Sequence, residues 1–81
     1  MLRQKKLQLI ITFHTTTEAM AAENFCKLHQ LPGRLIPVPR QITASCGLAW
    51  MAEADRETEE KLQSAFRAEC LSWEVWQRLE I

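Results

Sequence analysis

The order of hydrophobic patterns along the chain is the feature that most constrains its fold. In residues 7–13 every second side chain is a large apolar one, which is typical of a strand. Thr15, followed three residues later by Glu18, has the spacing of a helix capping box. The same two kinds of signal, applied to the rest of the sequence, predict strands at 7–13, 34–38, 46–51 and 72–81 and helices at 16–29 and after Asp55.

This order, β-α-β-β-α-β, is the split βαβ arrangement of ferredoxin-like folds. We therefore expect an α+β two-layer sandwich, with an antiparallel sheet in the strand order 4-1-3-2 and both helices on one face. Pro37 and Pro39 lack the backbone N–H that a central strand needs, so the second strand belongs at a sheet edge. Because no internal linker is found, residues 1–81 are expected to form one domain.

Charge and hydropathy argue against two classes of protein. Ten basic and ten acidic residues cancel, whereas a nucleic-acid-binding protein normally carries a basic face. No apolar run approaches the roughly 18 residues that a membrane-spanning helix needs. The apolar run near the N-terminus lacks a small-residue cleavage site, so it is interpreted as the first strand and not as a signal peptide.

The cysteines favour a reducing compartment. There are three of them, an odd number, and no Cys-x-x-Cys motif occurs, so the cytoplasm is the expected location. Cys26 and Cys70 lie on predicted helices among apolar neighbours and are interpreted as core residues. Cys26 and His29 alone do not make a metal site, and neither a metal nor another cofactor is expected.

Residues 34–50, RLIPVPRQITASCGLAW, contain the strongest candidate for chemistry. Cys46 lies where a loop meets the third predicted strand, between the small residues Ser45 and Gly47 and six positions after Arg40. A buried structural cysteine does not need that setting, whereas a thiolate that must meet a small electrophile does. The sequence therefore indicates that Cys46 is a reactive thiol.

The predicted topology places Cys46 beside the start of the first helix, in an accessible position. There the partial positive charge of the helix N-terminus and the guanidinium of Arg40 are expected to favour the thiolate. His14 is a candidate proton partner, and small polar residues would bind the transferred group. The predicted site residues are Cys46, Arg40, His14, Thr15, Thr16, Thr17, Ser45 and Gly47. Alternatively, Arg40 and His14 are solvated surface residues and the threonines serve only to cap the helix.

Two segments resemble a known family. FHTTTEAMAAENF and RLIPVPRQITASCGLAW are similar to the selenium/sulfur carrier-like family, whose members share a strand ending in Phe, a Thr-rich turn and a Pro-Arg segment before Ser-Cys-Gly. The matching positions are Phe13, Thr15–Thr17, Ala22, Glu23, Arg34–Pro37, Pro39, Arg40 and Ser45–Ala49. The resemblance implies that Cys46 carries sulfur or selenium, as a persulfide or selenosulfide. The partners it implies are a donor protein, for example a cysteine desulfurase, and an acceptor protein, so the chain would be a carrier rather than a stand-alone enzyme.

Other functions stay open. A non-catalytic interaction module would use the open sheet face, where Ile10, Ile36, Ala49 and Met51 would be covered by a partner or a second copy of the chain. An RNA-recognition domain shares the topology, but the central strands carry few aromatic residues and the net charge is zero. A thiol redox enzyme would need a resolving cysteine near Cys46, and none is found in the sequence nearby.

Overall fold

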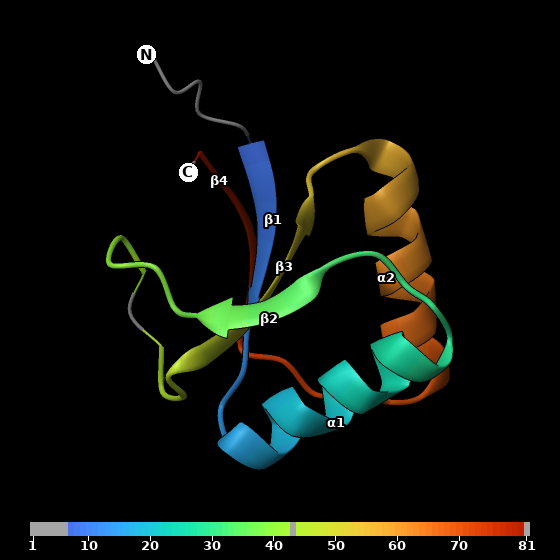
Figure 1. Cartoon of the computed structure of the whole chain (residues 1–81), viewed down its shortest axis with the longest axis horizontal. Coiled ribbons are helices and arrows are strands. Elements are labelled where there is room, and N and C mark those ends of the chain that lie inside the picture. The colour runs from blue at the N-terminus through green and yellow to red at the C-terminus, as the bar shows by residue number, and fades with distance from the viewer. Residues whose placement is uncertain (1–6, 43, 81) are drawn as a thin grey trace.

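The structure confirms the predicted order of elements and the predicted sheet. A computed structural model describes residues 7–42 and 44–80. Its elements are β1 (Leu7–Thr12), α1 (Thr16–Leu28), β2 (Arg34–Pro37), β3 (Leu48–Glu53), α2 (Arg56–Ala68) and β4 (Val75–Glu80). The four strands pair antiparallel in the order β2-β3-β1-β4, and both helices cover the same face of the sheet (Figure 1). The fold is thus the ferredoxin-like α+β sandwich.

Two strands begin later than predicted, and the ends of the first three strands differ from the prediction by one or two residues. β3 begins at Leu48 and not at Cys46, because the chain turns at Cys46 so that the Leu48 N–H donates to the sulfur. β4 begins at Val75 and not at residue 72, because Ser72 and the residues after it form the connection from α2. Ile81, the last residue of the predicted strand, lies outside the described residues.

Both helices begin at the predicted caps. The Thr15 side chain accepts from the Glu18 N–H at 3.1 Å, and the Glu18 carboxylate accepts from the His14 N–H at 2.9 Å. Asp55 caps α2 by accepting from the Thr58 N–H at 2.8 Å. These bonds satisfy N–H groups that have no partner within a helix, so they fix where each helix starts.

The helices end in the same way as each other, in Schellman motifs. Gln30 and Cys70 follow the two helices with φ of 55° and 52°, the left-handed region that usually holds glycine. The next residues, Leu31 and Leu71, donate their N–H groups to the carbonyls five residues earlier, at 2.8 and 2.9 Å. Cys70 is exposed there, so its interpretation as a core residue is wrong: it lies beyond the buried stripe of α2.

The core lies between the sheet and the two helices. From the sheet it takes Leu9, Ile11, Phe13, Trp50 and Ala52, and from the helices Ala19, Ala22, Cys26, Leu62 and Phe66. The small residues of α1 allow the helix to lie close to the sheet, and the core position predicted for Cys26 is confirmed. The indole N–H of Trp50 donates to the Pro32 carbonyl at 3.1 Å, so this large side chain is both packed and hydrogen-bonded.

Gly33 is required by the turn into β2. Its φ is 112°, and a Cβ there would meet the Trp50 indole nitrogen and lie 2.7 Å from the Met51 carbonyl oxygen. Both contacts are tighter than a side-chain carbon tolerates. The approach of this turn to β3 therefore depends on the missing side chain.

The four residues predicted for the open sheet face do lie there, but two of them are already covered. The register pairs Ile10 with Met51 and Ile36 with Ala49, on the face opposite the core. Ile10 and Ala49 have no exposed surface, so the apolar area left open is smaller than expected. The partly exposed apolar residues of this face are Ile36, Met51, Val75 and Leu79.

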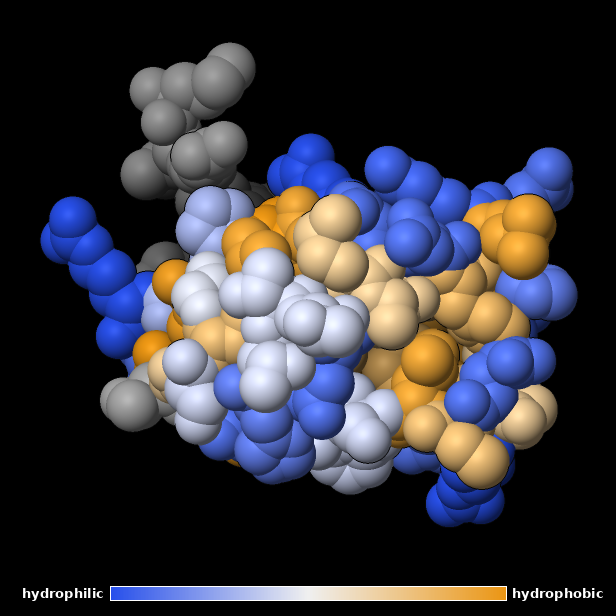
Figure 2. All heavy atoms as spheres, turned by 90° about the horizontal axis from the view of Figure 1, so that it is seen from below, coloured by the Kyte–Doolittle hydropathy of each residue, from blue (hydrophilic) through white to orange (hydrophobic). Residues whose placement is uncertain are grey.

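A second apolar surface lies on the outside of α1. Figure 2 shows apolar side chains gathered over this helix and the neighbouring end of α2. Met20 and Leu28 of α1 are 44% and 79% exposed, although the opposite side of the helix is buried.

No helix in the described part of the chain has the length and hydropathy to cross a membrane.

Candidate functional site

Cys46 lies beside the start of α1, at the end of the loop that joins β2 to β3. Its N–H donates to the Phe13 carbonyl at 3.3 Å, which ties the loop to the residue that follows β1. Its sulfur lies 3.9 Å from the Thr16 hydroxyl oxygen, on the first residue of α1. The first N–H groups of a helix lack intrahelical partners, so they leave partial positive charge at this end.

Two hydrogen-bonding groups contact the sulfur. The Leu48 N–H donates to it at 3.4 Å, and the Thr16 hydroxyl is within reach as either donor or acceptor. Donors of this kind stabilise negative charge on a sulfur atom, whether in a thiolate or in a persulfide. The Leu48 contact was not predicted, because it depends on a turn of the backbone that spacing does not reveal.

The predicted accessibility of Cys46 is wrong. The residue is 5% exposed and belongs to the buried cluster of the core. Its polar neighbours are the first residue of β3 and the first residue of α1. In this conformation the sulfur is held in a polar corner of the core, and a reagent must displace part of its surroundings to reach it.

Glu74 is a residue of the site that sequence reasoning missed. Its carboxylate accepts from both the backbone N–H and the hydroxyl of Ser45, at 3.1 and 2.8 Å. These bonds, and secondarily the charge of His14, lower the pKa of the Glu74 carboxyl. Ser45 and Glu74 are 29 positions apart, so only the folded arrangement of β1 and β4 brings them together.

His14 is near the site but is not bonded to Cys46. Its ring Nδ1 lies 3.3 Å from a carboxylate oxygen of Glu18, and the imidazole is largely exposed. The role of a proton partner for Cys46 remains a prediction.

Some of the other predicted residues lie at the site, and the rest are exposed to solvent. Thr15 caps α1, and only Thr16 of the three threonines contacts the sulfur in the described part of the chain. Arg40 is exposed in a turn of the loop and forms no ion pair or hydrogen bond with another described residue. Gly47 is exposed, and a Cβ on it would meet no atom within 4 Å other than those of its chain neighbours.

Comparison with known proteins now identifies the family. Residues 8–76 match the family described as "Putative Se/S carrier protein-like". The chain belongs to this family. Comparisons with curated proteins and with solved structures gave no match. The matched residues of this family member include every predicted site residue as well as Glu74.

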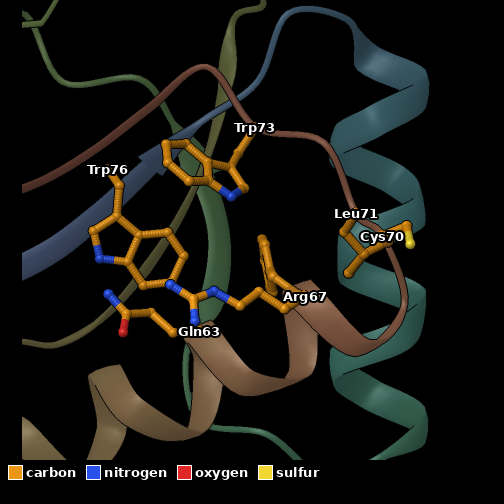
Figure 3. A pocket seen from close by; sticks show the side chains of 7 residues that line it. Gln63, Arg67, Cys70, Leu71, Trp73 and Trp76 are labelled. Carbon is orange, nitrogen blue, oxygen red and sulfur yellow. The ribbon is translucent and has the colours of Figure 1, made fainter.

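A separate cavity lies at the far end of α2 of this Se/S carrier-like chain. It has a volume of about 440 Å3 and is lined by Gln63, Phe66, Arg67, Cys70, Leu71, Trp73 and Trp76 (Figure 3). Trp76 packs edge-on against Phe66 and Trp73, with ring centroids 5.7 and 5.5 Å away, and Trp73 is 42% exposed. Cys46 is not among the lining residues, so this cavity does not serve the thiol directly.

A metal centre finds no support in the described residues. Over 7–42 and 44–80, no group of three or more His, Cys, Asp or Glu side chains is placed to hold an ion. What the arrangement around Cys46 offers is hydrogen-bond donors to a sulfur atom. That chemistry fits a thiolate that accepts and releases one atom.

Proposed function

We propose that the chain carries sulfur or selenium on Cys46, between a donor protein and an acceptor protein in the cytoplasm. The observation that carries the proposal is the placement of the Cys46 sulfur against the Leu48 N–H and the Thr16 hydroxyl in a member of this family. The protein would act as a carrier and not as an enzyme by itself. A cysteine desulfurase that bears a persulfide is the class of donor that this chemistry requires.

The transfer step is a thiol–persulfide exchange. The Cys46 thiolate attacks the terminal sulfur of the donor's persulfide, a new S–S bond forms at Cys46, and the donor cysteine leaves as a thiolate. The electron count balances without an outside oxidant or reductant. An acceptor nucleophile then takes the terminal sulfur from Cys46 in the same way, and the Cys46 thiolate is restored.

The groups around the sulfur support this step. After loading, the negative charge moves to the terminal atom, and donors at the start of α1 lie on the side where Thr16 contacts the thiol. Arg40 supplies a permanent positive charge on the same loop, available to a partner that approaches it.

Mass measurement tests the proposal directly. The chain is incubated with a cysteine desulfurase and cysteine, and its intact mass is recorded without reducing agent. We expect a gain of about 32 Da for each sulfur atom bound. With selenocysteine as the substrate, the size of the gain distinguishes selenium from sulfur.

The exposed Cys70 provides the matched control. In Cys70→Ser the adduct should remain, because the carrier thiol is intact, and in Cys46→Ser it should be lost. Circular dichroism of both variants confirms that the fold is retained. An adduct of undiminished amount in Cys46→Ser would show that the assignment to Cys46 is incorrect.

A second, non-catalytic function is favoured by the open sheet face. Ile36, Met51, Val75 and Leu79 leave partly exposed apolar surface on three strands of one face. Apolar surface of this kind marks sites of protein association when it is contiguous. An interaction module that pairs through this face, with a second copy of the chain, would need no reactive thiol.

A further inference from the structure

The loop that carries Cys46 is attached to the body of the protein at few points. Val38 donates its N–H to the Gly47 carbonyl at 3.0 Å, which closes the base of the loop against the β2–β3 pair. The loop then projects on the side of the sheet away from the helices (Figure 1). Among the described residues, hydrogen bonds that tie it to other elements come only from Ser45 and Cys46, the two residues that end it.

The Ser45–Glu74 clamp is the stronger of these attachments. One carboxylate takes two hydrogen bonds from the single residue that precedes Cys46, at 3.1 and 2.8 Å. Hydrogen bonds to an ionised acceptor are about twice as strong as neutral ones. The other contacts come from Cys46: a neutral bond of 3.3 Å from its N–H to the Phe13 carbonyl, and the 3.9 Å contact of its sulfur with the Thr16 hydroxyl.

Glu74 is itself held firmly. Its N–H donates to the Thr12 carbonyl at 2.6 Å, and the next residue, Val75, donates to the Thr12 hydroxyl at 3.1 Å. Thr12 is fully buried at the end of β1, in the middle of the sheet. The carboxylate is therefore fixed to a central strand, while the loop that it holds lies at the surface.

We propose that Glu74 is a positioning residue whose clamp on Ser45 holds the neighbouring Cys46 docked in the core, and that release of the clamp exposes the thiol. The sulfur is 5% exposed in the closed form, so a partner's sulfur atom cannot line up with it until the loop moves. Opening requires loss of the two Ser45 bonds, the neutral Cys46 bond and the Thr16 contact, and it withdraws Cys46 from the core cluster. The link to sulfur transfer rests on the proposed function, whereas the clamp itself does not.

The three cysteines of the chain make the test internally controlled. Cys70 is exposed and reports the intrinsic reactivity of a free thiol, whereas Cys26 is completely buried on α1 and reports global opening. The folded chain is treated with iodoacetamide, and the rate at each cysteine is followed by mass spectrometry of its peptide. In Glu74→Ala we expect Cys46 to react roughly tenfold faster, with the rates at Cys26 and Cys70 unchanged.

Two control variants separate the clamp from simple electrostatics. Glu80→Ala removes an exposed carboxylate from the same strand and should leave all three rates as they are. Glu18→Gln removes a negative charge at the start of α1 without touching Ser45, and should also leave the ratio of the Cys46 and Cys26 rates unchanged.

Three outcomes would overturn the proposal. The first is a Cys46 rate in Glu74→Ala that equals the rate in the unaltered chain. The second is a Cys46 rate that rises only in proportion to the Cys26 rate. The third is a Glu18→Gln variant in which Cys46 reacts as fast as it does in Glu74→Ala. Because alkylation needs no donor protein, its result is independent of the mass test. A chain that fails to load sulfur can still show the clamp, and a loaded chain can lack it.

Discussion

Two buried cysteines of this chain have different surroundings. Cys26 is enclosed by apolar side chains on α1, and desolvation raises its pKa from 9.0 to about 11. Cys46 is almost as buried, but the Leu48 N–H and the Thr16 hydroxyl contact its sulfur. The first environment suits a thiol that keeps its proton, whereas the second provides hydrogen-bonding partners for a sulfur atom.

Cys26 should therefore make stability fall in alkali. The unfolded chain releases this proton near pH 9, whereas the folded chain keeps it until about pH 11. The contribution is fully present below pH 9 and is lost as pH rises through 11, with a change of about 2 kcal/mol over that interval. Urea unfolding at several pH values should show the loss in the unaltered chain.

The Cys26→Ala variant provides the reference for this measurement. At neutral pH it should be less stable by about 1 kcal/mol, because it leaves a small cavity. Near pH 11 the order should reverse, since the variant has no thiol to titrate. Parallel stability curves for the two chains would show that Cys26 is not responsible.

At the level of the elements, the loops that enter β2 and β3 differ in how much room they leave. Gly33 is pressed against β3 with a φ of 112°, whereas Gly47 lies beside open space. Both are single glycines that precede a strand, so the sequence does not distinguish them. The left-handed φ of Gly33 and the close packing of Trp50 and the Met51 carbonyl against this turn together make Gly33 irreplaceable.

The two alanine variants should differ clearly in their free energy of unfolding. Gly33→Ala introduces a Cβ that meets β3 in a left-handed conformation, and should lower the free energy of unfolding by about 2 kcal/mol or more. Gly47→Ala should change it by less than about 0.5 kcal/mol. Chemical denaturation of both variants measures the difference, and losses of equal size would contradict the packing seen at Gly33.

For the whole molecule, the second candidate function implies that the chain pairs with itself through the open sheet face. The second candidate function predicts a dimer by light scattering, dissociated by Met51→Glu, which places a charge on that face. Leu28→Glu, on the exposed side of α1, is the control and should leave the dimer intact. A monomer at every concentration would contradict self-association.

The fold could be predicted from sequence because the signals for its helices and strands are local in the chain. Capping residues predict where the helices begin, at Thr15 and Asp55, and the alternation of apolar residues predicts β1. The βαββαβ order then restricts how these elements can be arranged. The candidate thiol at Cys46 stands out by its small neighbours. Its place next to α1 then follows from the topology.

The surroundings of Cys46 could not be predicted in the same way. Glu74 reaches Ser45 across 29 positions, and the turn that brings the Leu48 N–H to the sulfur depends on how the loop packs. The same packing buries the thiol, which was expected to be accessible. Such features arise from non-local contacts, for which periodicity and spacing carry no signal.

Under the proposed function, the 5% exposure of Cys46 has a consequence for the lifetime of a sulfur or selenium atom bound to it. Sulfane sulfur on an open surface is stripped within reach of any abundant small thiol, such as glutathione, in the exchange that also loads it. A cargo enclosed by its own protein would escape such scavenging and be surrendered mainly on docking with a recipient. Burial of the sulfur would thus favour its transfer to the acceptor protein over its loss to small thiols, even where these thiols are in large excess.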